Sequence, residues 1–168
     1  MFNKLKQNYR LANVLSRVLF VAAYVFATWQ RYLQASFLII AEQNLLVALL
    51  ASALVGVVAQ FIVPLLVKMF LNMSRIHSVP VAEYCVLALL YFSAAMAASG
   101  AVCLVGWFVP VASVWLGVLA PVAATLVVGF LFFRRTSALY FNDVTAVAYA
   151  KSYFVAWVIL LVIVGVIL

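Results

Sequence analysis

A group of polar residues interrupts the first apolar stretch of the chain. The group consists of Gln30, Arg31 and Gln34. If one helix runs straight through residues 18–40, these side chains lie inside a bilayer, where ionisable residues usually mark a binding site or a transport path. Glu42 and Gln60 are then the natural partners for the guanidinium of Arg31. This interpretation predicts a polar site within the membrane.

A second interpretation places Arg31 at the outer surface of the membrane. Trp29 and Tyr32 flank it, and amphipathic aromatic side chains beside a cation are typical of the headgroup boundary. The following residues, 35–41, then form a shallow re-entrant or interfacial segment. We prefer this second interpretation.

A second charged group follows the fourth apolar run. It consists of Arg134, Arg135, Asp143 and Lys151. Arg135 and Asp143 are eight residues apart, as are Asp143 and Lys151, so a helix presents all three on one face as a ladder of charges. Such a face fits an anionic lipid or a partner protein. The simpler interpretation, which we prefer, is a set of cations that extend to the headgroups beside a single acid.

The other residue types offer little for catalysis. The chain has three acidic residues and one histidine, and His77 has no Cys, Asp or second His at the spacing of metal ligands. No serine lies in a motif typical of a nucleophile, and no glycine-rich phosphate loop is present. We therefore expect no catalytic residue, no metal and no cofactor, in a protein that is not an enzyme.

The composition indicates an integral membrane protein. Hydrophobic residues make up 71% of the 168 residues and charged residues 8%, against roughly 25% charged residues in soluble domains. The formal net charge is +7, but the basic residues stand at the ends of apolar runs. That placement is typical of contact with anionic lipid headgroups and not of nucleic-acid binding. The predicted fold is an all-α transmembrane bundle in a single domain, residues 1–168.

Five apolar runs predict five membrane spans, because about 20 apolar residues cross a bilayer. The spans are 11–29, 45–69, 84–107, 111–133 and 152–168. The third and fourth form a hairpin over residues 84–133, with no charged residue inside it and a turn at 108–110. In the alternative, the last run only dips into the membrane and four helices span it.

The distribution of cations predicts the orientation. With five spans, one side of the membrane has nine Lys and Arg residues and the other has Arg31 alone. Since cytoplasmic loops carry the excess of basic residues, we expect the N-terminus in the cytoplasm and the C-terminus outside. Residues 1–17, with Phe2, Leu5, Tyr9 and residues 11–15 on one face, can form a helix that rests on the membrane surface.

Small residues recur at every fourth position in two of the predicted spans. The second span has Ala48, Ser52, Gly56, Gln60 and Pro64, and the fourth has Ser113, Gly117, Pro121, Thr125 and Gly129. A spacing of four keeps residues on one helix face, where small side chains let helices approach closely. We interpret the following as helix-packing residues: Ser52, Gly56, Gly117, Pro121 and Gly129. The alternative is a substrate path lined by the same residues.

The order of features from Leu45 onward is informative as a whole. A long second span ends in Leu66-Val67-Lys68-Met69-Phe70, and it is followed by a short polar loop, the hairpin 84–133, Arg134-Arg135 and the segment 148–154. This layout resembles the Yip family of five-span membrane proteins. The acidic, Gly-Pro-containing signature that eukaryotic members carry before their first span is absent, so the resemblance does not extend to a GTPase partner. It implies a non-enzymatic membrane protein that acts through partners or lipids.

These patterns predict a scaffold or accessory subunit of a complex in the bacterial cytoplasmic membrane. It is expected to contact membrane lipids and either a membrane-protein partner or further copies of itself. The alternative comes from another functional class. It is a small oligomeric transporter or permeation component that uses the polar site around Arg31.

Overall fold

The computed structural model describes residues 9–34, 45–73, 79–105, 110–141 and 143–167. These residues form five α-helices and no strand, which confirms the predicted all-α fold for this part of the chain. The helices are α2 (Tyr9–Gln34), α3 (Leu45–Met73), α4 (Val81–Val105), α5 (Pro110–Tyr140) and α6 (Asp143–Ile167). For some helical residues, among them 30–34, 110–118, 143 and 159–167, the description covers the backbone alone.

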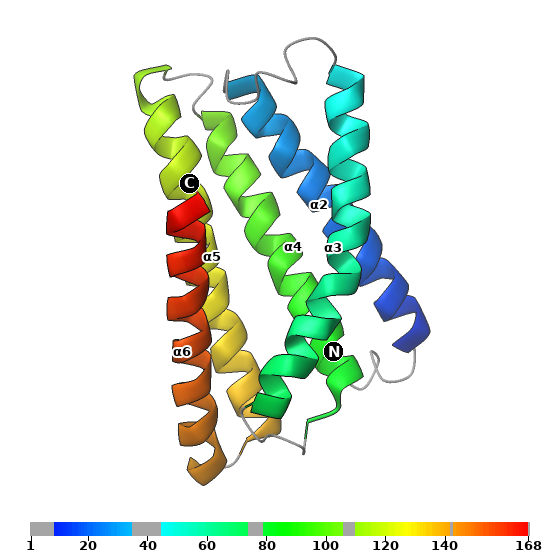
Figure 1. The fold of residues 1–168 in the computed structure, drawn as a ribbon, viewed down its shortest axis with the longest axis vertical. Coiled ribbons are helices and arrows are strands. Elements are labelled where there is room, and N and C mark those ends of the chain that lie inside the picture. Colours follow the sequence, from blue (N-terminus) through cyan, green and yellow to red (C-terminus); the bar gives the residue numbers. More distant parts are fainter. Residues whose placement is uncertain (1–8, 35–44, 74–78, 106–109, 142, 168) are drawn as a thin grey trace.

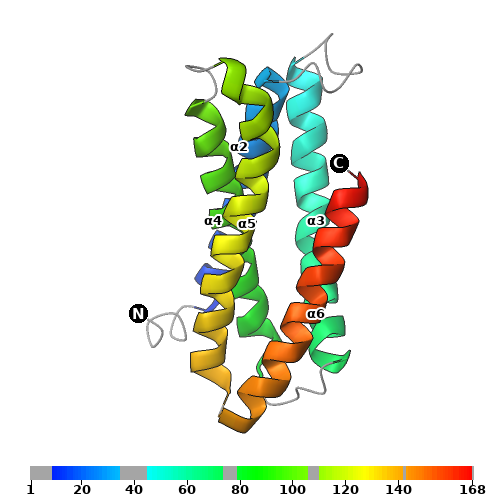
Figure 2. The same ribbon diagram turned by 90° about the vertical axis from the view of Figure 1, so that its left-hand side faces the viewer.

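The helices alternate in direction along the bundle (Figure 1). α2, α4 and α6 therefore begin toward the end where α3 and α5 finish, and we call this the basic end because Lys68, Arg134, Arg135 and Lys151 lie toward it. α4 contacts α2, α3 and α5, whereas the main contact of α6 is with α5. Figure 2 shows that α6 then diverges from α5 toward its C-terminal end.

Local sequence accounts for where α4 and α5 begin. Pro80 precedes α4, and the backbone N–H of Tyr84 donates to the Pro80 carbonyl at 3.1 Å. Glu83 lies in the first turn of α4, where a carboxylate interacts favourably with the helix dipole. Pro110 is the first residue of α5, a position where its missing N–H costs no hydrogen bond. The two helices pack against each other in antiparallel directions.

α2 buries a polar residue and directs a row of apolar residues outward. Ser16 is completely buried, whereas Leu11, Val14 and Val18 are each at least 60% exposed. A soluble helix has the opposite arrangement, but a lipid-facing helix gains from it because every polar group finds its partner inside the protein. α2 is therefore built for an apolar surrounding.

Within the described residues, four helices are long and apolar enough to cross a membrane. The candidate spans are Tyr9–Trp29, Leu49–Asn72, Val81–Leu104 and Leu119–Tyr140. Together with the outward-facing apolar side chains of α2, they indicate a membrane-embedded helix bundle. The span in α5 includes Arg134 and Arg135 near its end, because the helix continues past the predicted limit at residue 133 to Tyr140.

The start of the chain differs from the surface helix expected there. Residues 1–8 lie outside the described part, but Tyr9 and the residues up to Arg17 are the first turns of α2 and not a separate helix. The physical reason is that Ser16 and Phe20 are buried in the bundle. These contacts hold the first turns in line with the rest of the span.

Candidate functional site

A cluster of buried side chains joins α3, α4, α5 and α6 near the basic end, and we call it the aromatic core. Its buried members are Val67, Leu71, Val79, Tyr84, Cys85, Leu87, Ala88, Phe132 and Tyr149. Partly buried aromatic residues, among them Phe70, Tyr91, Phe133, Phe141 and Tyr153, pack around them. The cluster thus holds the start of α6 against the three neighbouring helices.

Tyr149 of α6 is the centre of this cluster. Its ring stacks on Phe133 of α5, with centroids 5.4 Å apart and planes at 10°, and on Phe141, with centroids 4.3 Å apart and planes at 18°. Phe70 of α3 meets the same ring edge-on at 6.2 Å. Such pairs each contribute about 0.5–1.5 kcal/mol beyond the burial of their area.

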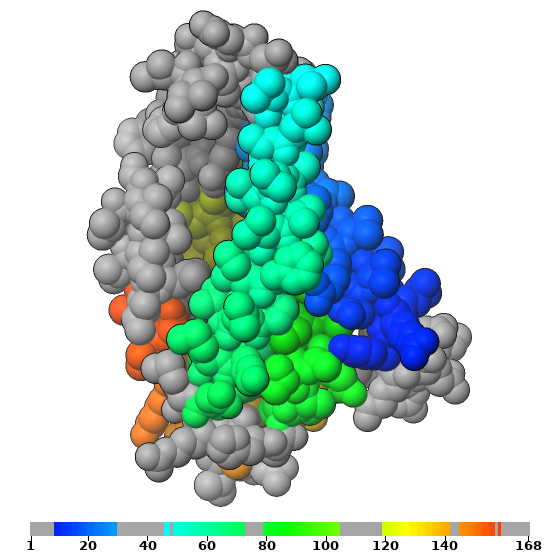
Figure 3. All heavy atoms as spheres, turned by 45° about the vertical axis from the view of Figure 1, so that its right-hand side comes forward, coloured from blue at the N-terminus to red at the C-terminus, as the bar shows by residue number. Residues whose placement is uncertain are grey.

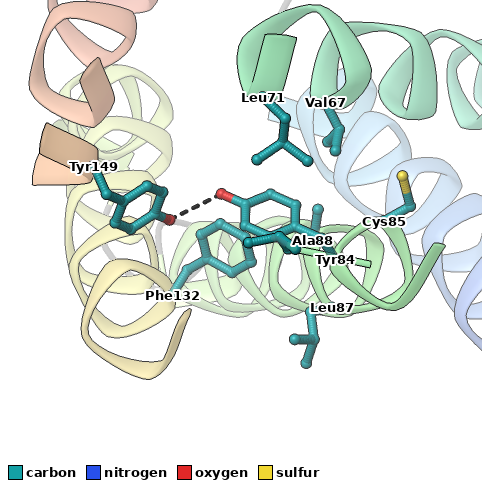
Figure 4. Packing of buried hydrophobic residues seen from close by; sticks show 9 residues of the cluster. Val67, Leu71, Tyr84, Cys85, Leu87, Ala88, Phe132 and Tyr149 are labelled. Carbon is teal, nitrogen blue, oxygen red and sulfur yellow. Dashed lines mark hydrogen bonds between the residues drawn. The ribbon is translucent and has the colours of Figure 1, made fainter. Parts of the chain in front are cut away.

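Three hydroxyl groups lie in contact inside the aromatic core. The Tyr84 hydroxyl is 2.9 Å from the Tyr149 hydroxyl, which is 2.7 Å from Thr136 Oγ1. Figure 4 shows the Tyr84 and Tyr149 hydroxyls pointing toward each other, with Phe132 beside the pair. Tyr149 and Thr136 are completely buried, and Tyr84 is 2% exposed. One chain of hydrogen bonds therefore crosses from α4 through α6 to α5.

The direction of this chain follows from the number of protons. A hydroxyl has one proton to donate, and Thr136 donates its proton to the backbone carbonyls of Phe132 and Phe133, at 2.8 and 3.1 Å. Thr136 Oγ1 must then accept from Tyr149, and the Tyr149 hydroxyl must accept from Tyr84. The chain thus runs from Tyr84 to Tyr149 to Thr136 and ends on a carbonyl of α5.

Two further polar contacts reinforce the same junction. The Tyr153 hydroxyl of α6 donates to the Gly129 carbonyl of α5 at 2.8 Å. The Tyr140 hydroxyl of α5 donates to Glu83 Oε2 of α4 at 3.4 Å. Hydrogen bonds between membrane helices are worth about 0.6–2 kcal/mol each, so these contacts fasten the three helices together.

The hydrogen bonds of this arrangement join helices, and none of its hydroxyls is placed to react. Burial raises the pKa of Tyr149, which precedes the predicted last span, so its hydroxyl keeps its proton and remains a donor. The chain ends on a backbone carbonyl, which is not a base. Among the residues that the structure describes, no three His, Cys, Asp or Glu side chains come together to hold a metal ion.

Part of the predicted charged group lies next to the aromatic core along the chain. Arg134 and Arg135 are exposed on α5, and Lys151 is exposed on α6. Asp143 is the first residue of α6, but its side chain lies outside the described part. The three cations lie at a similar level, because their neighbours Phe133 and Tyr149 are stacked. The ladder of charges through Asp143 stays a prediction.

The predicted polar site around Arg31 lies at the other end of the bundle. Gln30, Arg31 and Gln34 are in the last turns of α2, and their side chains lie outside the described part, as does Glu42. Gln60 is half-buried near the middle of α3. Both interpretations of Arg31, the polar site and the headgroup contact, stay predictions.

The predicted packing residues have distinct surroundings. Ser52 and Gly56 are buried on α3, and a Cβ on Gly56 would lie 3.4 Å from the ring of Tyr24 of α2. Pro121 and Gly129 are half-buried on α5. Gly117 is also on α5, and its burial lies outside the described part. Gly129 contributes its carbonyl to Tyr153, a role that small size alone does not indicate.

Sequence reasoning missed a polar contact within the first span. Arg17 Nε donates to Asn13 Oδ1 at 3.2 Å, and its guanidinium carbon lies 5.5 Å from the ring centroid of Phe61 of α3. The available signal was the spacing of Asn13, Ser16, Arg17 and Phe20, which places all four on one helix face. The prediction of orientation instead counts Arg17 among the nine cations on the cytoplasmic side of the membrane.

In comparisons with known proteins, no family model, no curated protein and no solved structure matches the chain.

Proposed function

We propose that the protein is a non-enzymatic scaffold or accessory subunit of a membrane complex. The observation that carries the proposal is that buried side chains include hydrogen-bonded hydroxyls, whereas the outward-facing side chains of α3 are apolar. Inside, four buried hydroxyl residues, Ser16, Ser52, Ser93 and Thr136, donate to carbonyls of their own helices. Outside, α3 presents Leu50, Leu54, Phe61 and Leu65, each at least 60% exposed. These buried hydroxyls thus find their acceptors within their own helices, and apolar helix faces are left for contact with lipid or protein.

We further propose five spans, with the N-terminus in the cytoplasm, the C-terminus outside, and a bacterial cytoplasmic membrane as the location. The alternating helix directions support this topology, because Arg10, Lys68, Arg134 and Lys151 lie toward one end of the bundle. An excess of cations on one side is typical of the cytoplasmic face. The five-helix layout also keeps the resemblance to the Yip family as a working hypothesis.

The experiment is to extract the full chain from its own membranes in a mild detergent and determine what remains bound in a fixed ratio. Light scattering of the purified particle gives a mass to compare with the 18.5 kDa chain. The proposal expects one integral membrane protein in constant stoichiometry, whose assembly fails when this chain is deleted. A particle that contains this chain alone contradicts the accessory role.

The same preparation tests the transporter alternative, which depends on side chains around Arg31. Purified protein is reconstituted into liposomes, and the exchange of ions and small solutes is measured for the natural chain and for Arg31→Gln. Solute exchange that requires Arg31 replaces the accessory role with transport. We expect liposomes with and without the protein to be equally tight.

A further inference from the structure

The guanidinium of Arg17 lies within the membrane-spanning part of the bundle. Phe61, whose ring it covers at 5.5 Å, is twelve residues after Leu49 and eleven before Asn72, the ends of the candidate span in α3. At about 1.5 Å per residue, Phe61 is about 10 Å from Lys68, and Arg17 is about 12 Å from Tyr9, where the candidate span in α2 begins. The guanidinium therefore lies inside an apolar layer about 30 Å thick, in the half toward the basic end. Figure 1 agrees, since α2 begins part-way along the bundle and not level with the end of α3.

Arg17 also lies at the edge of the protein and not in its interior. Arg17 is half-buried, and Phe61 is 60% exposed. Val14 and Val18 flank Arg17 on α2, and Leu65 follows Phe61 by one turn on α3; each is at least 60% exposed. We call these five residues the α2–α3 surface. Figure 3 shows α2 and α3 side by side on this face of the molecule, with α4 visible between their lower parts.

A cation at this depth requires an anion, because an ionised side chain in hydrocarbon is costly unless it is paired. The chain has three acidic residues, and α2, α3 and α5 contain none of them. Glu83 is in the first turn of α4, where it accepts from Tyr140, and Asp143 is the first residue of α6. The third acid, Glu42, lies in the connection between α2 and α3, outside the described residues.

Two other sources of an anion fit less well. A second copy of the chain brings the same three acids, none of them near the middle of a described helix. The phosphates of lipid headgroups lie outside the apolar layer, about 10 Å or more from the guanidinium. A carboxylate on the transmembrane helix of another protein is the anion that reaches this depth.

We propose that Arg17 forms an ion pair with an aspartate or glutamate in a transmembrane helix of a partner protein, which packs on the α2–α3 surface. This inference rests on the proposed accessory role and names the chemistry of its partner. The carboxylate accepts hydrogen bonds from the guanidinium in place of water. The apolar flanks of the partner helix cover Val14, Val18, Phe61 and Leu65.

The test uses the full chain in phosphatidylcholine vesicles, with synthetic transmembrane peptides as probes. The probe is a Leu-Ala helix of about 22 residues with one central aspartate, and control peptides have asparagine or leucine at that position. Association is measured by energy transfer between a dye on the peptide and a dye on the protein. The aspartate peptide should bind at least about tenfold more tightly than the leucine peptide, as expected when an intramembrane charge finds its counter-ion.

Variants of the chain locate the effect. Arg17→Gln should remove the preference for aspartate, while Arg10→Gln, which removes an exposed cation from the start of the same helix, should preserve it. If Arg17→Gln does not yield a monodisperse protein, the comparison of aspartate and leucine peptides on the natural chain still decides the question. Equal binding of the peptides, or an unchanged preference in Arg17→Gln, overturns the proposal.

Two further outcomes also overturn it and identify the true anion. If Glu42→Gln raises the affinity for the aspartate peptide, Arg17 was already paired within the chain. If phosphatidylglycerol added to the vesicles abolishes the aspartate preference, a lipid phosphate is the counter-ion. The accessory role is tested separately from the ion pair. A stoichiometric complex that survives Arg17→Gln overturns the ion pair and leaves the accessory role intact.

Discussion

The polar groups of the aromatic core and of the α2–α3 surface differ in their burial and in their hydrogen bonding. In the aromatic core, the hydroxyls of Tyr84, Tyr149 and Thr136 are buried, and each donates to a partner within the chain. At the α2–α3 surface, the cation Arg17 is half-buried beside the exposed ring of Phe61. The first arrangement holds helices together, and the second is suited to contact with another molecule. Substitutions in the two regions should therefore change different properties.

The largest expected effect on stability is that of Tyr149→Ala in the aromatic core. The substitution removes a completely buried ring, its stacking on Phe133 and Phe141 and the middle hydroxyl of the chain. Truncation of a buried aromatic residue costs about 3–5 kcal/mol. Reversible unfolding in mixed micelles measures this loss. Phe130→Ala is the matched control, because its side chain is 62% exposed, and a comparable loss there would mean that the aromatic core has no special role.

The next effect concerns the contact that positions α2. A Cβ on Gly100 of α4 would lie 2.6 Å from the Phe26 ring of α2, closer than carbon atoms approach, whereas a Cβ on Gly56 would lie 3.4 Å from Tyr24. Gly100→Ala should therefore cost about 1–3 kcal/mol of stability through overpacking, and Gly56→Ala should change little or stabilise slightly. The same unfolding assay decides it. The smaller, branched side chain in the double variant Gly100→Ala, Phe26→Leu should restore part of the loss, and no restoration would disprove the contact.

A smaller effect tests the direction of the hydroxyl chain. Tyr149→Phe deprives the buried Tyr84 hydroxyl of its acceptor, and a buried donor without a partner costs about 1–3 kcal/mol. Tyr84→Phe removes only the first donor and leaves Tyr149 bonded to Thr136, so it should cost about 0.5–1.5 kcal/mol. The ranking of the two unfolding free energies is the measurement. Equal costs, or the reverse order, would contradict a chain that begins at Tyr84.

The contrast between the two regions also explains how far the sequence could predict them. Apolar runs and the lack of charges over 84–133 were enough for an all-α membrane bundle, since composition and length govern spanning helices. The continuation of α5 to Tyr140 was not predicted, because Arg134-Arg135 suggested the end of a span. Helix geometry tolerates such residues where long side chains reach out from an exposed face.

The site was less predictable than the fold. The hydroxyl chain joins Tyr84, Thr136 and Tyr149, which are up to 65 residues apart in sequence, and no local pattern connects them. Arg17 had a local signal in Asn13 and Ser16, but its meaning depended on the depth of Phe61 in another helix. Pairing between distant helices is set by tertiary packing, which one sequence does not specify.

The smallest expected effect on stability is that of Arg17→Gln, and it sharpens the comparison most. In the isolated chain the described neighbours of the guanidinium are an exposed ring, one amide and, at longer range, the Cys85 thiol, and a cation–π contact of this kind contributes about 0.5–1 kcal/mol. The loss in unfolding free energy should therefore stay below about 1 kcal/mol, well under that of Tyr149→Ala. Phe61→Leu should cost no more, because it removes the other half of the same contact. If Arg17→Gln instead destabilises the isolated chain as strongly as Tyr149→Ala, Arg17 is part of the core and not of an interaction surface. A small cost in stability combined with loss of aspartate-peptide binding separates the two regions by function. A substitution in the aromatic core should lower stability, whereas Arg17→Gln should lower binding with the fold intact.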